Sequence, residues 1–257
     1  MFPMNSYQKI LYQIEHGVAK ITLNRPEKRN ALDAELISEI KDAIRACARD
    51  ENVRVVLIRG TGADFCSGAD LSGLHQRAEA GPLENMADAR NMAELFIEMR
   101  HHPHPIIAAV QGRALAGGCG LATAADVVLA CESAKFGYPE VNIGFVPAMV
   151  MAILRRSVSE KRAFELITTA EIISAQTAFD IGMINRVFAD ETFDLDVEAY
   201  ASKLASKSAS AITLSKRLLY HMDSMGFEPA IEAGVETNAI ARMTADMKQG
   251  LEKSLKR

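Results

Sequence analysis

The segment from residue 107 to residue 127 constrains the fold of this chain more than any other stretch. Its apolar start predicts a buried strand, Gly112 predicts a turn, and the small residues that follow predict a short helix before another strand. A helix that begins with glycine leaves its first N–H groups open to a ligand oxygen, here at Gly117 and Gly118. The helix dipole favours negative charge at that point, as in an oxyanion hole. The alternative is that these glycines and Gly120 only allow close packing of helix and strand.

The glycines do not match a nucleotide-binding loop. Gly112 and Gly117 have the spacing of a phosphate loop, but Gly118 and Cys119 stand where that loop needs Lys and then Ser or Thr. Residues 60–65 (GTGADF) follow an apolar run, yet they lack the third glycine of a dinucleotide fingerprint. The sequence therefore does not favour a nucleotide ligand.

The composition is typical of one large domain, or of a domain with a helical extension. The 257 residues are 49% hydrophobic and 24% charged, which is enough to bury a sizeable core. A net charge of −4 with scattered Lys and Arg does not favour nucleic acid. The chain has no apolar stretch of about 18 residues and no signal-like start, so we expect a cytoplasmic protein without membrane segments. The four cysteines are widely spaced, and we expect them to be reduced thiols.

Strand and helix patterns alternate along most of the chain and predict the α/β class. Apolar runs predict strands at the positions named below, and Asp33 is expected to cap a helix that runs to about Asp50. From about residue 194 the apolar residues follow helical spacing alone. We therefore expect a core over residues 1–193 and a helical region over residues 194–257. The expected strands are 18–23, 53–58, 106–110 and 127–131.

Several motifs, in their order and spacing, resemble the crotonase superfamily, which contains the enoyl-CoA hydratases and isomerases. They are residues 24–32 (NRPEKRNAL), 65–70 (FCSGAD), 107–127, 134–140 (AKFGYPE) and 172–185. The resemblance covers nearly the whole chain. It implies a spiral of repeated β-β-α turns, with C-terminal helices that pack against neighbouring subunits in trimers or paired trimers.

The resemblance also implies a site for an acyl-CoA thioester. The backbone N–H groups of Ala69 and Gly117 would bind the thioester oxygen, and Glu140 would take or deliver a proton at the α-carbon. Burial in an apolar pocket would raise the pKa of Glu140. Coenzyme A would arrive as part of the substrate, and no metal or redox cofactor is expected. The residues implied in substrate binding are Lys28, Arg29, Ala69, Asp70, Leu71, Gly117 and Gly118.

One position departs from the best-known hydratases, because Gly120 stands where they carry a second glutamate that activates water. Three interpretations remain open. The first and favoured one is an enoyl-CoA hydratase that uses Glu140, alone or with another group such as His75, Glu79 or Glu94. The second is a Δ3,Δ2-enoyl-CoA isomerase, which needs only Glu140. The third is a non-catalytic acyl-CoA-binding scaffold, against which the retention of Glu140 argues.

Three further places in the sequence bear on the reaction and the ligands. Hydrolase, dehalogenase and dienoyl-isomerase relatives place an aspartate where this chain has Ala148, so their chemistry is not expected. Residues 149–151 (MVM) suggest an adaptable apolar acyl pocket, although methionines at this spacing are also ordinary core residues. The histidines of residues 101–104 have no accompanying carboxylate or cysteine pair, and we expect no metal site there.

Overall fold

The structure, a computed structural model, describes residues 7–76 and 80–256, the side chains of residues 74–76 excepted. Two sheets organise the chain. The first sheet has the order β1-β2-β3-β4-β6-β9 and consists of β1 (Ile10–Glu15), β2 (Val18–Leu23), β3 (Val55–Gly60), β4 (Ile106–Val110), β6 (Val127–Cys131) and β9 (Arg186–Phe188). The second sheet has the order β5-β7-β8 and consists of β5 (Arg113–Leu115), β7 (Lys135–Gly137) and β8 (Ile173–Ser174). Within the first sheet only the β1–β2 pair is antiparallel.

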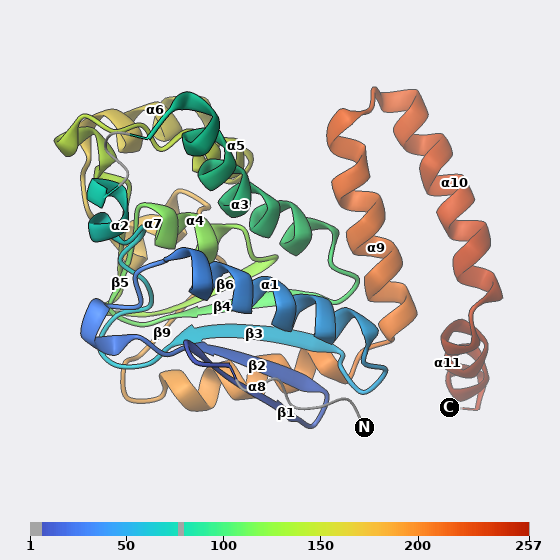
Figure 1. Ribbon diagram of the computed structural model, residues 1–257. Helices are drawn as coiled ribbons and strands as arrows, with labels where there is room; N and C mark the ends of the chain where they lie inside the picture. The colour runs from blue at the N-terminus through green and yellow to red at the C-terminus, as the bar shows by residue number, and fades with distance from the viewer. Residues whose placement is uncertain (1–6, 77–79, 257) are drawn as a thin grey trace.

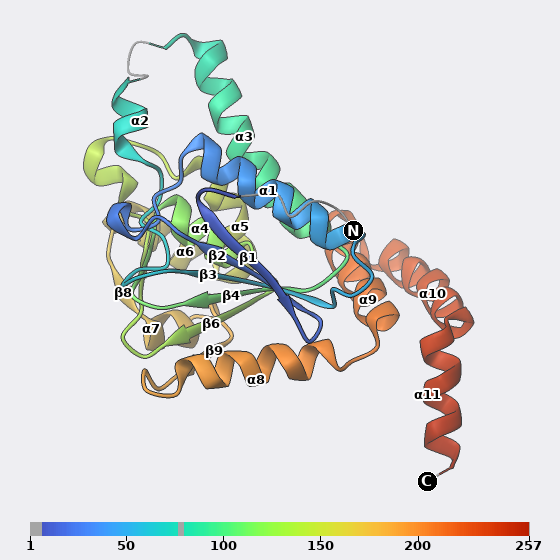
Figure 2. The ribbon, with the colours of Figure 1, turned by 60° about the horizontal axis from the view of Figure 1, so that its bottom comes forward.

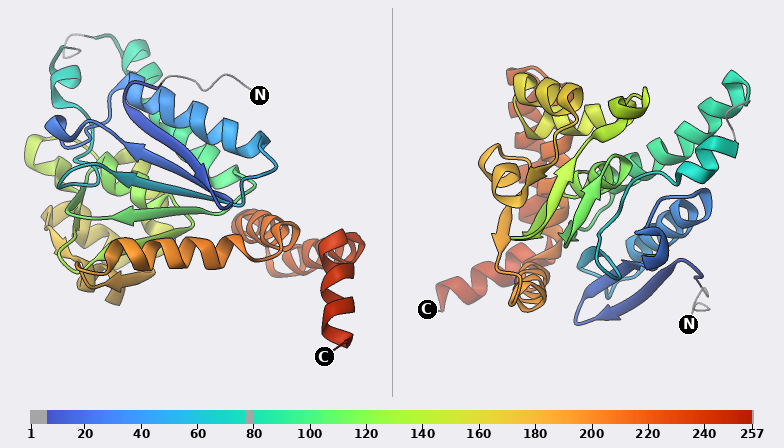
Figure 3. Two further views of the ribbon diagram at one scale, coloured as in Figure 1. Left: turned by 90° about the horizontal axis from the view of Figure 1, so that it is seen from below. Right: turned by 90° about the vertical axis from the view of Figure 1, so that its left-hand side faces the viewer.

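Helices cover both faces of the first sheet. In Figure 2, α1 and α8 lie on opposite sides of it. Figure 1 and Figure 3 show α9 beside the layered core, with α10 and α11 lying farther out. The helices are α1 (Ala34–Arg49), α2 (Leu71–Gln76), α3 (Pro82–His101), α4 (Gly117–Thr123), α5 (Ala148–Ser157), α6 (Glu160–Thr169), α7 (Ala175–Asp180), α8 (Phe193–Ala205), α9 (Ala209–His221), α10 (Phe227–Met243) and α11 (Ala245–Leu255), with short 3₁₀ helices η1 (Pro26–Lys28), η2 (Pro139–Ile143) and η3 (Met222–Ser224).

Most of the expected elements are confirmed. The side chain of Asp33 accepts a hydrogen bond of 2.9 Å from the N–H of Leu36 and so caps α1, whose apolar face is buried. The strand expected from residue 53 is wrong at its start, because β3 begins at Val55. The N–H of Val53 is bonded instead to the carbonyl oxygen of Asp50 at 3.0 Å, so the first residues of this apolar run close a turn.

The predicted spiral of β-β-α turns is confirmed. After β4 the chain turns at Gly112, with φ of 56°, into β5 of the second sheet, and then enters α4 before β6 returns to the first sheet. Strand β7 in turn pairs with β5, placing Gly137 opposite Leu115. This arrangement brings the start of α4 and the residues after β7 to the same end of the molecule.

The C-terminal part is helical, as expected. Helix α8 still packs on the first sheet. Its residues Phe193, Val197 and Ala201 are buried. Helix α9 is held to the core by a buried ion pair of 2.6 Å between Lys216 and Asp126. The division of the chain into a core that ends at residue 193 and a helical region that begins at residue 194 stays a prediction. None of the helices in the described part of the chain is both long and apolar enough to span a membrane.

Candidate active site

The N–H group of Ala69 is left free by the way its loop pairs with the segment before α1. Leu32 forms a parallel bridge with Ala69, in which the N–H of Leu32 donates to the oxygen of Gly68 at 2.8 Å and the N–H of Asp70 donates to the oxygen of Leu32 at 2.9 Å. In such a bridge the intervening residue directs its own N–H to the other side. Within the described residues, the Ala69 N–H donates to no protein acceptor.

A second free N–H lies beside it, at Gly117, the first residue of α4. The preceding residue, Ala116, has a φ of 50° and donates its N–H to the oxygen of Gly137 at 2.9 Å, which ties the start of α4 to the end of β7. A first-turn N–H has no partner within its own helix. A Cβ at Gly117 would lie 3.9 Å from the nitrogen of Ala69 and would touch nothing closer than 3.8 Å. The two amides therefore lie close to one another.

The other glycines of this segment serve packing. A Cβ at Gly112 would lie 1.8 Å from the oxygen of Ala63, and a Cβ at Gly118 would lie 2.3 Å from the oxygen of Cys66. Both neighbours are backbone atoms, which cannot move away cheaply. The two interpretations of the glycine cluster thus apply to different members of it. A Cβ at Gly117 would make only ordinary van der Waals contacts, whereas Gly112 and Gly118 allow close approach of the backbone.

Glu140 lies in η2, shortly after β7, and its carboxyl group is largely buried. Glu140 is 9% exposed, and its Oε2 atom is buried without a hydrogen-bond partner among the described residues. Burial raises the pKa of Glu140 above its ordinary value of 4.5. Burial also raises the pKa of the Cys119 thiol to about 12, and the charge of Glu140 adds to that rise. The hydroxyl of Tyr138, two residues before Glu140, lies 3.4 Å from Oγ1 of Thr123 in α4, so the segment that carries Glu140 lies beside this helix.

The place of a second carboxylate is filled by apolar side chains. A Cβ at Gly120 would lie 2.2 Å from Cγ1 of Val150 and 3.3 Å from Cζ of Phe96. Glu94, one of the substitutes considered for the missing glutamate, is ion-paired with Lys41 at 3.1 Å. The side chain of His75 and all of Glu79 lie outside the described residues. Within the described part of the chain, Glu140 is therefore the carboxyl group that the apolar site holds.

The residues expected to bind coenzyme A surround the Ala69 loop at its exposed side. Lys28 and Arg29 lie exposed at the end of η1, and the oxygen of Arg29 accepts a hydrogen bond of 3.0 Å from the N–H of Ser67. Leu71 begins α2 and is 61% exposed. The carboxylate of Asp70 is engaged with the side chain of Arg25 at 3.2 Å. These positions could contact an extended ligand that passes the Ala69 loop.

Sequence reasoning missed Asn30, which joins the motif of residues 24–32 to the loop that follows β3. Its buried side chain accepts a hydrogen bond from the N–H of Arg25 and donates to the oxygens of Thr61 and Asp64, each at 2.9 Å. A Cβ at Gly60 would lie 2.7 Å from the side-chain nitrogen of Asn30. The motif that contains Asn30 is visible in the sequence, but its spacing does not indicate which member is buried.

The arrangement suits proton transfer beside a carbonyl group. Removing or adding a proton at an α-carbon places negative charge on the carbonyl oxygen, and preorganised N–H donors stabilise that charge. A carboxyl group of raised pKa can exchange the proton. The fold and the site together define a protein of the crotonase superfamily.

The comparisons with known proteins agree. The chain belongs to the family described as enoyl-CoA hydratase/isomerase, which it matches over residues 13–256. It is 38% identical to a Thermus thermophilus protein named provisionally as an enoyl-CoA hydratase, over 94% of this chain and 96% of the relative. It is 33% identical to a crotonyl-CoA hydratase of Syntrophomonas wolfei, over 96% of this chain and 94% of the relative.

Solved structures of the same family share the fold over almost the whole chain. An enoyl-CoA hydratase of Mycobacterium smegmatis has a TM-score of 0.92 at 32% identity, covering 97% of this chain and 96% of its own. Human enoyl Coenzyme A hydratase domain-containing protein 3 has a TM-score of 0.92 at 27% identity, covering 97% and 98%. The protein is therefore a crotonase-fold acyl-CoA enzyme.

Proposed function

We propose that this enzyme is an enoyl-CoA hydratase that adds water to a 2-enoyl-CoA with Glu140 as its proton-transfer group. One observation carries the proposal: Glu140, whose buried Oε2 has no hydrogen-bond partner among the described residues, follows the strand that is tied to the start of α4, where the N–H groups of Gly117 and Ala69 lie close together. The names of the relatives support hydration. Crotonyl-CoA hydratase and 2,3-dehydroadipyl-CoA hydratase, at 33% and 32% identity, are both named for it.

A single carboxylate suffices for the reaction. The ionised Glu140 takes a proton from water as the water oxygen forms a bond to C3, and the electrons of the C2–C3 double bond move toward the thioester oxygen. The amides of Ala69 and Gly117 stabilise the resulting enolate, each donor contributing about 2.7 to 4 kcal/mol. The protonated Glu140 then gives its proton to C2. Both parts of the water molecule are in the product, and Glu140 returns to its ionised form.

Isomerisation is the second candidate, and the packing at Gly120 favours it. Val150 and Phe96 occupy the space in which a second carboxylate would hold water. Moving a double bond from C3 to C2 needs only one base, which removes a proton from C2 and returns it at C4. Glu140 and the two amides provide this chemistry without further groups.

The wider assignments follow from the proposed reaction. Coenzyme A enters as part of the substrate, and the chemistry needs no metal or redox cofactor. The loop from Ala69 to Leu71 and the backbone at Gly118 would hold the thioester and its adenine end, with Lys28 or Arg29 at the phosphates. We infer a homo-oligomer in the cytoplasm, assembled through the C-terminal helices. A purely acyl-CoA-binding scaffold would not need the buried Glu140, whose ionisation the fold resists.

Separate assays with crotonyl-CoA and 3-hexenoyl-CoA test the proposal. Loss of the enoyl absorbance of crotonyl-CoA supports the hydratase, whereas conversion of 3-hexenoyl-CoA alone supports the isomerase. Glu140→Gln should lower kcat about 10³-fold, while the Kd for the product, measured by calorimetry, changes little. Glu132→Gln replaces an exposed glutamate and serves as the matched control. Binding without turnover of either substrate would leave only the scaffold.

A further inference from the structure

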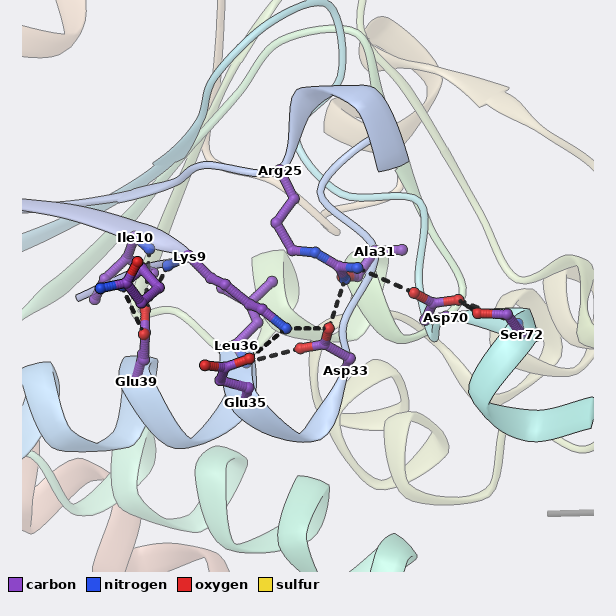
Figure 4. A network of polar contacts seen from close by, with 11 residues as sticks. Lys9, Ile10, Arg25, Ala31, Asp33, Glu35, Leu36, Glu39, Asp70 and Ser72 are labelled. Atoms are coloured by element: carbon purple, nitrogen blue, oxygen red, sulfur yellow. Dashed lines mark hydrogen bonds and ion pairs between the residues drawn. The ribbon is translucent and has the colours of Figure 1, made fainter. Parts of the chain in front are cut away.

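The side chain of Arg25 lies at the centre of a polar network beside the Ala69 loop (Figure 4). It is only 12% exposed, and its guanidinium contacts groups from two segments of the chain. Nη1 donates to the oxygen of Ala31 at 2.5 Å and lies 3.1 Å from Oδ2 of Asp33, while Nη2 donates to Oδ2 of Asp70 at 3.2 Å. Arg25 thus joins the start of α1 to the loop that carries Ala69.

Two peptide units connect this guanidinium to the Ala69 N–H. The oxygen of Ala31 and the N–H of Leu32 belong to one peptide unit, and the oxygen of Gly68 and the N–H of Ala69 belong to another. In a trans peptide the C=O and N–H groups point in opposite directions. Since Leu32 donates to Gly68 at 2.8 Å, the series of bonded groups runs from Arg25 through Ala31–Leu32 and Gly68–Ala69 to the N–H of Ala69. We call this the Arg25 hydrogen-bond chain.

Such a chain has two effects on its last donor. The bond from Leu32 to Gly68 fixes the plane of the peptide unit that contains the Ala69 N–H, and therefore fixes the direction of that N–H. Hydrogen bonds in series also polarise one another, by about 10–30% per bond, and a charged donor at the first position strengthens the effect. A positive charge at Arg25 thus makes the Ala69 N–H a better donor to a distant oxygen.

The acidic side chains around Arg25 hold it in place. Asp70 also accepts hydrogen bonds at Oδ1 from the N–H of Ser72 at 3.1 Å and from its hydroxyl at 2.5 Å, which anchors the carboxylate to the first turn of α2. Asp33 is fixed as the cap of α1. The guanidinium is therefore held between two carboxylates that are themselves fixed, which suits it for positioning the loop.

The second amide has no comparable connection. The oxygen of Ala116, which shares a peptide unit with the Gly117 N–H, accepts a hydrogen bond of 3.0 Å from the N–H of Gly120. This donor is a neutral backbone group of α4. The two amides are thus supported differently: the helix supports Gly117, and the cation supports Ala69.

We propose that Arg25 is a positioning residue for the reaction, which orients and polarises the Ala69 N–H through the Arg25 hydrogen-bond chain. The proposal rests on the proposed function, in which that N–H binds the thioester oxygen. It predicts that loss of Arg25 weakens stabilisation of the enolate more than it weakens binding of the substrate. A purely structural role would lower stability and leave the bound carbonyl unchanged.

The test is isotope-edited infrared spectroscopy of crotonyl-CoA with ¹³C at the thioester carbonyl. In the Glu140→Gln protein, which retains the substrate, we expect the C=O stretch to shift to lower frequency on binding. Adding Arg25→Met should reduce that shift at least by half, while the Kd changes less than threefold. Arg25→Lys keeps the positive charge but loses the planar guanidinium with its several donors, and it should give an intermediate shift. With Glu140 present, Arg25→Met should lower kcat about tenfold at nearly constant KM.

The control variant is Glu35→Gln. Glu35 belongs to the same network through an ion pair of 2.7 Å with Lys9, yet it is 58% exposed and touches no member of the Arg25 hydrogen-bond chain. Its substitution should leave the shift and kcat unchanged. Circular dichroism and a thermal melt establish that each variant folds, and Arg25→Lys carries the test if Arg25→Met does not fold.

The possible failures are distinguishable. If binding to the Glu140→Gln protein does not shift the C=O stretch, the two amides do not bind the thioester oxygen. The proposed function and this inference would then both be wrong. A normal shift there, together with a full shift in a folded Arg25 variant, would overturn the inference alone.

Discussion

At the scale of single residues, the burial of Glu140 makes its ionised form costly in the folded protein. Its raised pKa means that the folded state binds the proton more tightly than the unfolded state does. The cost of ionisation is therefore fully present above the folded pKa, and it is relieved as the pH falls through that value toward 4.5. Stability and activity make opposite demands on this carboxyl group.

This predicts that Glu140→Gln stabilises the protein at neutral pH. The free energy of unfolding should rise at pH 7, because glutamine has nearly the same shape but no charge to bury. Wild type should gain stability as the pH falls through the folded pKa of Glu140, and the variant should lack that gain. Urea denaturation at several pH values measures both effects, with Glu132→Gln as control. Equal stability of all three proteins at pH 7 would contradict the burial argument.

The pH dependence of the rate should carry the same signature. Glu140 must be ionised to accept a proton, so kcat/KM should fall with decreasing pH along a limb whose midpoint lies above 4.5. A midpoint at or below 4.5, measured with crotonyl-CoA or 3-hexenoyl-CoA over the acid range, would mean that the reacting group is not a buried carboxylate.

At the scale of elements, the contact between α4 and α5 decides which side chains α4 can carry. Gly120→Ala should destabilise the protein by about 1 to 3 kcal/mol, because the added Cβ would lie 2.2 Å from Cγ1 of Val150. Val150→Ala should relieve the clash, so that the double variant loses less stability than the two single changes together. Gly117→Ala should cost less than Gly120→Ala, since its Cβ has no neighbour within 3.8 Å. Urea denaturation measures all four variants, and equal losses for both alanines would contradict the packing described.

Elements with strong periodicity could be predicted from the sequence, and short ones could not. Helix α1 has six apolar residues on one face and a capping aspartate, so its limits follow from local chemistry. Strand β5 spans only Arg113–Leu115 and exists because it pairs with β7, which no local pattern reveals. At the site, the resemblance indicated Glu140 and the two amides. The role of Gly118 in packing depends on the distant Cys66, and the connections of Arg25 depend on how two loops meet.

At the scale of the whole molecule, α10 and α11 carry an exposed apolar surface. Large apolar side chains are exposed along both helices, and such surfaces mark contacts between proteins. Since α9 is fixed to the core by Lys216, the helices that follow it have a defined starting point from which to reach a second copy. The exposed residues include Phe227, Ile231, Val235, Met243, Met247, Leu251 and Leu255.

This predicts a homo-oligomer that depends on α10. Wild type should sediment as a trimer or a pair of trimers, and Ile231→Asp combined with Val235→Asp should shift the population toward the monomer. Glu232→Gln, on the same helix, serves as the control. Analytical ultracentrifugation gives the masses, and a monomeric wild type at micromolar concentration would contradict the prediction.

Proton transfer at C2 tests the central claim most directly, because both proposed reactions form or break a C–H bond there. The enzyme is incubated with crotonyl-CoA in D₂O, or in H₂O with 3-hexenoyl-CoA that carries deuterium at C2, and NMR and mass spectrometry follow the gain or loss of deuterium at C2. We predict rapid gain or loss of deuterium with wild type for at least one of the two substrates, and almost none with Glu140→Gln, with the acyl-CoA still bound. Equal rates for both proteins, or no change with either substrate for wild type, would contradict the account.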